Sequence, residues 1–292
     1  MIEFRKVSKT FSGRAGSVAA LASVDLEVAE GEFVAIVGPS GCGKSTLLKL
    51  VAGLIGADSG EISIADRSPA SARDDKQLAF APQSPALLPW ATVRDNAQLL
   101  TKVNRRSGAG RVATEDEIDD LLLRVGLADF ADALPHELSG GMQQRVGLVR
   151  AFALHAPVLL MDEPFAALDE FVRTEMRYLL LDLWERNRAS VLFVTHSLSE
   201  AVSLADRIVV MAAQPGRIEH IHQVSLPRPR RPEQEDEVAF LTEIRAVRRL
   251  LAAQVKRSTH DSAPQAASVA AAEPTGVAAA EPTGVAAVVA AP

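Results

Sequence analysis

The sequence predicts an α/β fold in which helices cover a mainly parallel sheet. Short apolar runs rich in Val, Ile, Leu and Phe recur along the chain, and segments with helical periodicity separate them. That alternation is typical of strands that are buried on both faces of a parallel sheet. Two regions depart from it and predict an antiparallel β subdomain near the N-terminus and an inserted α-helical subdomain.

The expected strands fall into two groups. Alternating apolar and polar residues, as in strands with one solvated face, occur at 1–11, 24–32 and 60–66. Almost wholly apolar runs, which predict the parallel strands, occur at 32–38, 77–83, 158–164, 190–196 and 207–213. Helices are expected directly after the first of these runs, at 44–53, and before the fourth, at 171–188.

The remaining regions define the domain organisation. Residues 90–150 carry helical periodicity without a strand signal and predict the inserted subdomain, with 104–111 as its exposed loop. We expect one domain at 1–225, followed by a linker and an amphipathic helix at 226–257. The last stretch, 258–292, repeats EPTGVAA and has a low-complexity composition that predicts disorder. The basic run at 228–231 is expected to be solvated linker rather than a contact with anionic lipid.

Composition excludes several function classes. The chain has 292 residues and a single cysteine, Cys42, which excludes an internal disulfide and a zinc site built from cysteines. Its formal net charge of -6 gives no support to nucleic-acid binding. The N-terminus lacks the apolar segment of a signal peptide, and no window approaches the about 18 apolar residues of a membrane span. We therefore expect a soluble, cytosolic protein.

The segment GPSGCGKST matches the pattern G-x-x-x-x-G-K-[ST] between a predicted strand and a predicted helix. Glycines let the backbone form a cup of N–H groups at a helix N-terminus, where a phosphate binds. Lys44 is predicted to reach the β- and γ-phosphates and Ser45 to ligate Mg²⁺. The thiol of Cys42 is expected to have a lowered pKa there. The predicted nucleoside triphosphate site is Gly38, Pro39, Ser40, Gly41, Cys42, Gly43, Lys44, Ser45 and Thr46.

Another predicted strand, in VLLMDEP, ends in the carboxylates of Asp162 and Glu163. Ligands bind outside the carboxyl ends of the strands in open α/β sheets. Asp162 is therefore predicted to hold Mg²⁺, and Glu163 to act as a general base or to orient the attacking water. A pair of solvated acids at a strand end is the alternative.

The segment ELSGGMQQR opens a helix on Ser139, Gly140 and Gly141, a second helix N-terminus that could bind phosphate. Ahead of the strand that carries Asp162 and Glu163, it resembles the signature of ABC ATPases, and the resemblance covers residues 1 to about 225. It implies a P-loop NTPase fold of the RecA type, with ATP and Mg²⁺ as cofactors. It also implies a head-to-tail homodimer, in which the signature of one subunit closes on ATP held by the P-loop of the other.

The resemblance assigns roles to further residues. Gln83 is similar to the Q-loop glutamine that contacts Mg²⁺ and the attacking water. Leu168 and Asp169 are similar to the D-loop at the dimer seam. His196 is similar to the switch histidine that contacts the γ-phosphate, although a histidine at a strand end is, on its own, more often structural. Phe11 is similar to the aromatic residue on which adenine stacks, with a place in the core as its alternative.

The stretch after Gln83 resembles the importers within this family. Leu87, Leu88 and Trp90 match the region that receives a permease, and a buried turn of the helical subdomain is the alternative. The segments 87–97, 171–218 and 226–230 resemble importers of nitrate, aliphatic sulfonates and taurine, and some importers of thiamine precursors share them. The ATPase sequence does not choose among these solutes. The implied partners are integral-membrane permease subunits and, indirectly, a solute-binding protein, at the cytoplasmic face of the membrane.

Two other classes are weighed against this one. A soluble ABC protein acting on ribosomes or DNA usually has two ATPase cores or strong basic patches, whereas this chain has one P-loop and a negative net charge. A nucleotide kinase would not explain the signature or His196.

Two residues depart from the pattern of the ABC ATPase family: Pro82, where an aromatic residue is usual, and Gly147, where alanine is commoner. In a helix Gly147 costs about 1 kcal/mol unless something packs closely on it.

Overall fold

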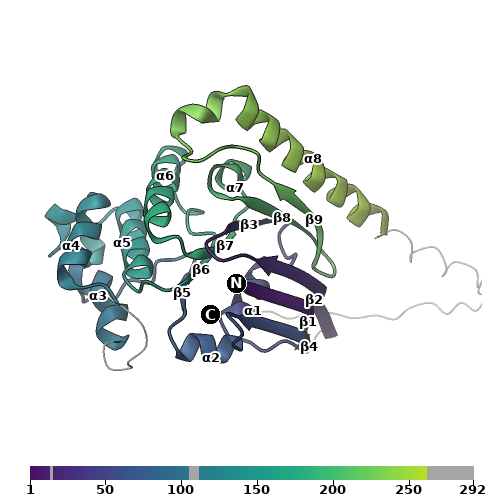
Figure 1. Ribbon diagram of the computed structural model, residues 1–292, viewed down its shortest axis with the longest axis horizontal. Helices are drawn as coiled ribbons and strands as arrows, with labels where there is room; N and C mark the ends of the chain where they lie inside the picture. The colour runs from purple at the N-terminus through teal and green to yellow at the C-terminus, as the bar shows by residue number, and fades with distance from the viewer. Residues whose placement is uncertain (14–15, 105–111, 262–292) are drawn as a thin grey trace, which may run out of the picture.

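The computed structural model describes residues 1–13, 16–104 and 112–261 (Figure 1). The expected exposed loop, apart from Asn104, and residues 262–292 of the expected tail lie outside these ranges. Within them, no helix is long and apolar enough to cross a lipid bilayer.

The larger sheet has six strands in the described residues, and it confirms the predicted fold class. Its strands, in spatial order, are β5 (Leu78–Ala81), β6 (Val158–Asp162), β7 (Ser190–Val194), β3 (Phe33–Val37), β8 (Arg207–Ala212) and β9 (Arg217–Gln223). All neighbours pair in parallel except β9, which is antiparallel to β8. The five apolar runs form the parallel strands. The edge strand β9 was not predicted, because its sequence, RIEHIHQ, is mostly polar.

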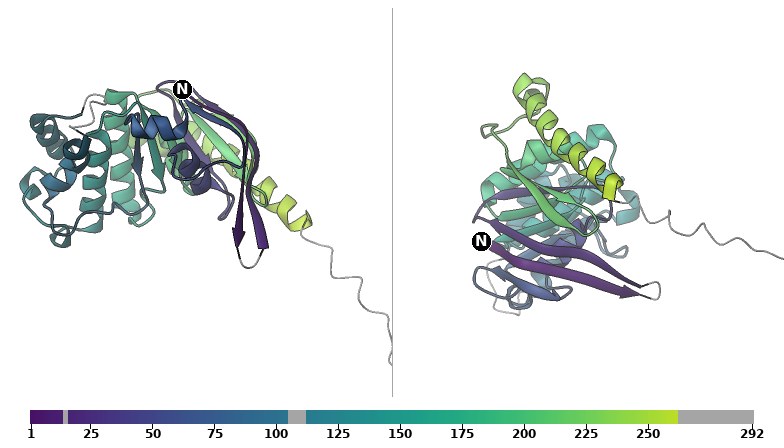
Figure 2. Two further views of the ribbon diagram at one scale, coloured as in Figure 1. Left: turned by 90° about the horizontal axis from the view of Figure 1, so that it is seen from below. Right: turned by 90° about the vertical axis from the view of Figure 1, so that its right-hand side faces the viewer.

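The N-terminal strands form a separate antiparallel sheet, as predicted. The strands of this sheet are β1 (Ile2–Gly13), β2 (Gly16–Val28) and β4 (Ser59–Ile64). The central strand β1 pairs with both others, so that Phe4 lies opposite Leu26 on one side and Ile62 on the other. The β1–β2 hairpin projects from the body of the molecule (Figure 2).

The two faces of the larger sheet are buried against different layers. On β3, Val34 and Ile36 belong to the core shared with the antiparallel sheet and with α1 (Lys44–Val51). Phe33, Ala35 and Val37 point to the opposite face. This period of two is what a strand buried on both faces requires. The helices with core residues on the Phe33 face include α5 (Gly140–Phe152), α6 (Glu170–Asn187), α7 (Leu198–Leu204) and α8 (Val238–Asp261). A short helix, α2 (Pro69–Asp74), packs near β4.

The segment between β5 and β6 contains helices and loops but no strand in its described part. It contains α3 (Val93–Asn104), α4 (Glu115–Arg124), two short 3-10 turns at Ala128–Phe130 and Pro135–Glu137, and α5. Helices α3, α4 and α5 lie together at one end of the molecule in Figure 1. A capping box fixes the start of α4, because Thr114 and Glu117 exchange side-chain to backbone hydrogen bonds.

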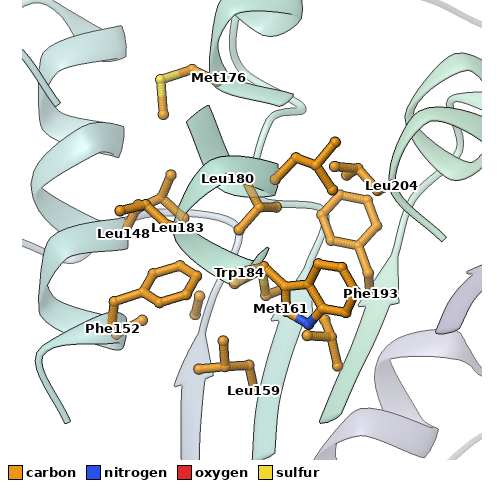
Figure 3. Packing of buried hydrophobic residues seen from close by; sticks show 14 of the residues in the cluster. Leu148, Phe152, Leu159, Met161, Met176, Leu180, Leu183, Trp184, Phe193 and Leu204 are labelled. Carbon is orange, nitrogen blue, oxygen red and sulfur yellow. The ribbon is translucent and has the colours of Figure 1, made fainter. Parts of the chain in front are cut away.

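Trp184 of α6 is the largest fully buried side chain of the core (Figure 3). Its ring meets that of Phe33 edge-on, with the centroids 5.5 Å apart. Its Nε1 donates a hydrogen bond of 2.7 Å to the carbonyl oxygen of Ala189, so that its polar atom is satisfied inside the core. Trp184 therefore ties α6 to the turn that leads into β7.

The basic run at 228–231 is folded onto the domain, so the expectation of a solvated linker is wrong there. Arg228 lies over the ring of Trp184 at 4.3 Å and donates to Oδ1 of Asp206 at 2.8 Å. Arg230 is buried and donates to backbone carbonyls at the end of α7, including that of Ala205 at 2.7 Å. Carbonyls at a helix C-terminus lack intrahelical partners, which explains why guanidinium groups bind there. The helix that follows, α8, runs to Asp261, four residues beyond its expected end.

We predict that the two tryptophans differ sharply in their contribution to stability. Trp184→Ala removes a fully buried ring and should lower the free energy of unfolding by about 3–5 kcal/mol. Trp90→Ala is the control, because Trp90 is 74% exposed; it should change that free energy by no more than about 0.5 kcal/mol. Urea unfolding followed by circular dichroism measures both. Equal effects would contradict this description of the core.

Candidate functional site

The segment 38–46 joins the end of β3 to the start of α1 as a phosphate-binding loop would. Gly43 has φ of 91° and contributes no side chain to cap the helix, so the first amides of α1 remain able to bind an anion. A Cβ atom on Gly43 would lie 2.6 Å from Leu21 Cδ2, and one on Gly38 would lie 2.7 Å from the carbonyl oxygen of Met211. Both positions therefore require glycine.

Lys44 lies folded over this loop. The residue is 7% exposed, and its Nζ donates to the carbonyl oxygens of Gly38 at 2.9 Å and Pro39 at 3.1 Å. The ammonium group is therefore held above the backbone of the segment 38–46, where it adds positive charge to that of the helix N-terminus.

The expectation for the thiol of Cys42 is wrong. The side chain is fully buried beneath the loop, where a Cβ on Gly38 would lie only 2.7 Å from its Sγ. Burial raises the pKa of this thiol, and the opposing effect of the nearby Lys44 charge is smaller. The sequence motif places Cys42 next to a helix N-terminus, but the side chain turns into the apolar core.

Ser45 and Asp162 meet across the sheet edge. Ser45 follows β3, Asp162 ends β6, and the Ser45 hydroxyl donates a hydrogen bond of 2.9 Å to Oδ1 of Asp162. Burial raises the pKa of the Asp162 carboxyl; the hydrogen bond from Ser45 opposes this, and the charge of Glu163 adds to it. The pair presents a hydroxyl and a carboxylate, which are hard oxygen donors, at the start of α1.

Glu163 and His196 form a second pair at the same edge. Oε2 of Glu163 lies 3.3 Å from Nδ1 of His196, which follows β7. Glu163 has φ of 46°, a conformation that non-glycine residues seldom adopt and that costs about 1–3 kcal/mol. Its amide is held by the carbonyl oxygen of Val194 at 2.9 Å. Backbone strain of this kind is concentrated at functional sites.

Sequence reasoning missed a buried network behind His196. Thr195 donates its hydroxyl to Oε2 of Glu200, which is 3% exposed and whose pKa is raised by burial. Nε of Arg173 lies 3.7 Å from the other oxygen of Glu200, and Nη2 of Arg173 donates to the carbonyl oxygen of Leu168 at 2.7 Å. The network thus joins the segment that carries Asp169 to the segment that carries His196. In the sequence, the only signal for this network was the presence of Glu200 and Arg173 themselves.

Two sequence-predicted residues stand apart from these pairs. Gln83 is exposed, two residues beyond the end of β5, and in the described chain no hydrogen bond joins it to Ser45 or Asp162. Phe11 is 45% exposed on β1, with Nζ of Lys9 5.7 Å from its ring centroid. The core alternative for Phe11 does not hold. A role in stacking on a base stays a prediction, as does the role of Gln83.

The signature segment lies at the N-terminus of α5. Ser139 caps this helix by accepting from the amide of Met142, and a Cβ on Gly140 would meet no atom within 4 Å. A Cβ on Gly141 would lie 2.9 Å from Val172, in the first turn of α6. Asp169 caps α6 in the same way, through the amide of Val172. Among the described residues, no hydrogen bond joins Ser139, Gly140 or Gly141 to the segment 38–46.

The residues that follow Gln83 divide into buried and exposed ones. Leu87 packs against the core, and Leu88 is half-buried, with both its backbone polar groups bonded to Asn96. Trp90 is 74% exposed, so the alternative of a buried turn does not hold for it. This stretch therefore presents one exposed tryptophan and two partly buried leucines, and its role in binding a permease stays a prediction.

The chain is similar to a protein family and to several of its members. A family described as ABC transporter matches residues 21–166. A putative ATP-binding protein of Brucella abortus is 48% identical over 217 residues, which is 74% of this chain and 82% of the relative. The nitrate import ATP-binding protein of Synechocystis sp. is 42% identical over 226 residues, covering 77% and 83%. An aliphatic sulfonates import ATP-binding protein of Xanthomonas axonopodis is 44% identical over 218 residues, covering 74% and 84%.

Solved structures give a consistent result. A dimeric ATP-binding cassette in a post-hydrolysis state, bound to ADP and phosphate, superposes with a TM-score of 0.67 at 32% identity. The match covers 78% of this chain and all of the other. An ATP-binding subunit of an ABC transporter matches with a TM-score of 0.66 at 26% identity, covering 84% and 98%.

The raised pKa of Asp162 predicts that this carboxylate lowers the free energy of unfolding at neutral pH, although we expect it to be needed for ATP hydrolysis. The folded state binds a proton at this carboxyl more tightly than the unfolded state, whose pKa is about 3.9. The free energy of unfolding therefore falls as pH rises through the interval between the two pKa values. Asp162→Asn removes this pH-dependent fall in the free energy of unfolding, and the asparagine oxygen can still accept a hydrogen bond from Ser45. The variant should therefore be more stable than the unchanged chain at neutral pH. It should lack Mg²⁺-dependent ATP hydrolysis.

Urea unfolding in EDTA across a pH series measures this difference. The stability gain should be full at neutral pH and should vanish below the pKa of the unfolded state. A variant that is less stable at pH 7, or a gain that is equal at all pH values, would contradict the proposed desolvation of Asp162.

Proposed function

The chain belongs to the ABC transporter family, and from this premise we propose that it is the ATP-hydrolysing subunit of an importer. The observation that carries the proposal is that two polar pairs meet at one edge of the sheet. Ser45 and Asp162 lie 2.9 Å apart, and Glu163 and His196 lie 3.3 Å apart. They are held at the end of the loop whose backbone and lysine can bind a triphosphate.

Mg²⁺ fits the residues that the chain supplies. Magnesium usually takes one or two carboxylates, the phosphates of its substrate and several waters, rather than a cage made only of protein. The Ser45 hydroxyl and the Asp162 carboxylate offer such a partial set, and desolvation raises the free energy of the unpaired carboxylate. We assign these two residues, with Gln83, as the magnesium ligands; the ion would neutralise charge on the phosphates.

Each remaining residue has a role that its position supports. Amides of residues 41–45 and the ammonium group of Lys44 bind the phosphates. Glu163 accepts a proton from the attacking water or orients it. The imidazole of His196, within hydrogen-bonding range of Glu163, would keep that carboxylate aligned and contact the γ-phosphate. The exposed ring of Phe11 stacks on adenine.

We propose that the catalytic unit is a head-to-tail homodimer. Ser139, Gly140 and Gly141 offer a second set of helix amides, and the space beside Gly140 is open. In the described chain these amides are not bonded to the segment 38–46, and in the proposed dimer they bind the triphosphate held by the segment 38–46 of the second copy. The superposed cassette that holds ADP and phosphate is dimeric. Asp169 would lie at the seam.

The importer role rests on the relatives and on the surface after Gln83. Curated relatives import nitrate or aliphatic sulfonates. We propose that separate integral-membrane permease subunits dock near Leu87, Leu88 and Trp90, with a solute-binding protein acting on those subunits. The chain would then work at the cytoplasmic face of the membrane, and its solute would be of the nitrate, sulfonate or taurine type. The ribosome or DNA alternative is not favoured.

Replacing the proposed base tests the reaction. Glu163→Gln keeps the shape and the hydrogen bonding but cannot take a proton. ATP hydrolysis should fall by about 100-fold or more, because a general base contributes roughly 10²–10⁴ in rate. ATP binding should be retained, and ATP should hold the variant as a stable dimer.

The matched control is Glu237→Gln, which changes an exposed glutamate between the linker and α8. It should hydrolyse ATP at the unchanged rate. Phosphate release with size-exclusion chromatography gives both readouts. Hydrolysis by Glu163→Gln at the rate of the control would remove Glu163 from the reaction.

A further inference from the structure

One arginine of α5 holds the backbone of the neighbouring loop. The 85–91 loop contains neither helix nor strand. Nη1 of Arg150, in the last turn of α5, donates to the carbonyl oxygens of Pro85 at 3.1 Å and Ala86 at 3.2 Å. Its Nε donates to the carbonyl oxygen of Asn96 at 3.0 Å and its Nη2 to Oδ1 of Asn96 at 2.7 Å. A single guanidinium group thus joins α5, the loop and α3.

Asn96 extends this connection through the rest of the loop. Its side chain is fully buried. Oδ1, which accepts from Arg150, also accepts from the amide of Leu88 at 2.8 Å. Nδ2 donates to the carbonyl oxygens of Leu88 at 3.1 Å and Ala91 at 2.9 Å. The two ends of the loop are therefore fixed by one continuous hydrogen-bond network that begins at Arg150.

Gly147 provides a second contact, one turn before Arg150. A Cβ atom at this position would lie 3.0 Å from Cβ of Pro85, so the helix backbone packs directly on that proline. This close approach is the compensation that a glycine inside a helix requires. A cavity of about 240 Å³ adjoins the contact, lined by Leu99, Leu100 and Leu148 among others. The polar network and the contact between Gly147 and Pro85 together attach the loop to α5.

Arg150 faces only uncharged oxygens. No carboxylate in the described part of the chain forms an ion pair with it, and burial lowers its pKa. Burial of an unpaired charge is unfavourable, and an apolar side chain of similar length would avoid that loss. What a guanidinium group offers instead is several donors in a fixed plane, which can hold separate backbone segments in one geometry.

We propose that Arg150 is a positioning residue that makes the 85–91 loop and the signature helix move as one body. The inference rests on the proposed function, in which this loop receives the permease and Ser139 at the other end of α5 reaches the partner's ATP. The helix between Ser139 and Arg150 is continuous, with a length of about 17 Å at the usual rise per residue. A displacement of the loop is therefore carried to Ser139 without any change inside α5.

The test compares two arginines of the same helix. Arg150→Lys keeps the charge but cannot reach Pro85, Ala86 and Asn96 together. Arg145→Lys is the matched control, because Nη1 of Arg145 also donates to a backbone carbonyl, that of Val125, at 2.9 Å, and its guanidinium pairs with Glu175. Both changes are made in the full chain that carries Glu163→Gln, so that ATP-driven dimers accumulate. Hydrogen exchange at the amide of Leu88, ATP affinity, dimer dissociation constant and thermal midpoint are measured.

For Arg150→Lys we expect exchange at Leu88 to be faster and dimerisation weaker, each by about tenfold, since a lost hydrogen bond from a charged donor has roughly that effect. ATP affinity of the monomer should not change. Arg145→Lys should alter neither exchange at Leu88 nor dimerisation, even where its thermal midpoint falls equally. Equal effects of both variants, or unchanged exchange and dimerisation in Arg150→Lys, would overturn the inference.

The two proposals fail in different ways. If the chain with Glu163→Gln alone does not dimerise with ATP, the proposed function is wrong. Exchange at Leu88 then still decides whether Arg150 holds the loop: protection that is unchanged in Arg150→Lys would overturn that role as well.

Discussion

The site depends on the constraint that parallel strands present their carboxyl ends at one edge of a sheet. β3 leads there to the segment 38–46, β6 ends in Asp162, and β7 is followed by His196. Residues more than a hundred positions apart in the sequence are brought together in this way, as the hydrogen bond between Ser45 and Asp162 shows. Pairing of β6 with β7, and of β7 with β3, sets the spacing of these groups. Ligand binding at this edge is the general rule for open α/β sheets.

Several residues at or near this edge adopt conformations or occupy environments that raise the free energy of the folded state. Glu163 adopts a left-handed backbone conformation, and Asp162 is a carboxylate whose pKa burial has raised. In the helical segment, Arg150 is half-buried and forms no ion pair with a carboxylate in the described chain. The apolar core offsets these terms: α6 alone buries Met176, Leu180, Leu183 and Trp184 against the sheet. Strained and desolvated groups of this kind persist where the surrounding structure holds them in place.

Local patterns allowed much of the fold and of the site to be predicted. Apolar runs located the parallel strands, and the motifs around Lys44 and Asp162 located the sheet edge, because both signals are encoded within a few residues. Contacts between distant segments were not predictable in this way. The side chain of Cys42 turns into the core, Arg230 binds the end of α7, and Glu200 joins Thr195 to Arg173. Each of these contacts depends on how the helices and strands pack against one another. The periodicity of apolar residues in the sequence does not specify that packing.

The central claim is that one triphosphate is bound by the P-loop of one copy and by the signature of another. Two variants test it, each in a chain that also carries Glu163→Gln: Lys44→Met weakens the P-loop, and Ser139→Asp keeps the helix cap but sets a negative charge against the phosphates. Native mass spectrometry with ATP counts the copies and the bound nucleotides. The account predicts that each variant alone stays monomeric, whereas their mixture forms heterodimers holding one ATP. A mixture that remains as monomeric as its components would contradict it.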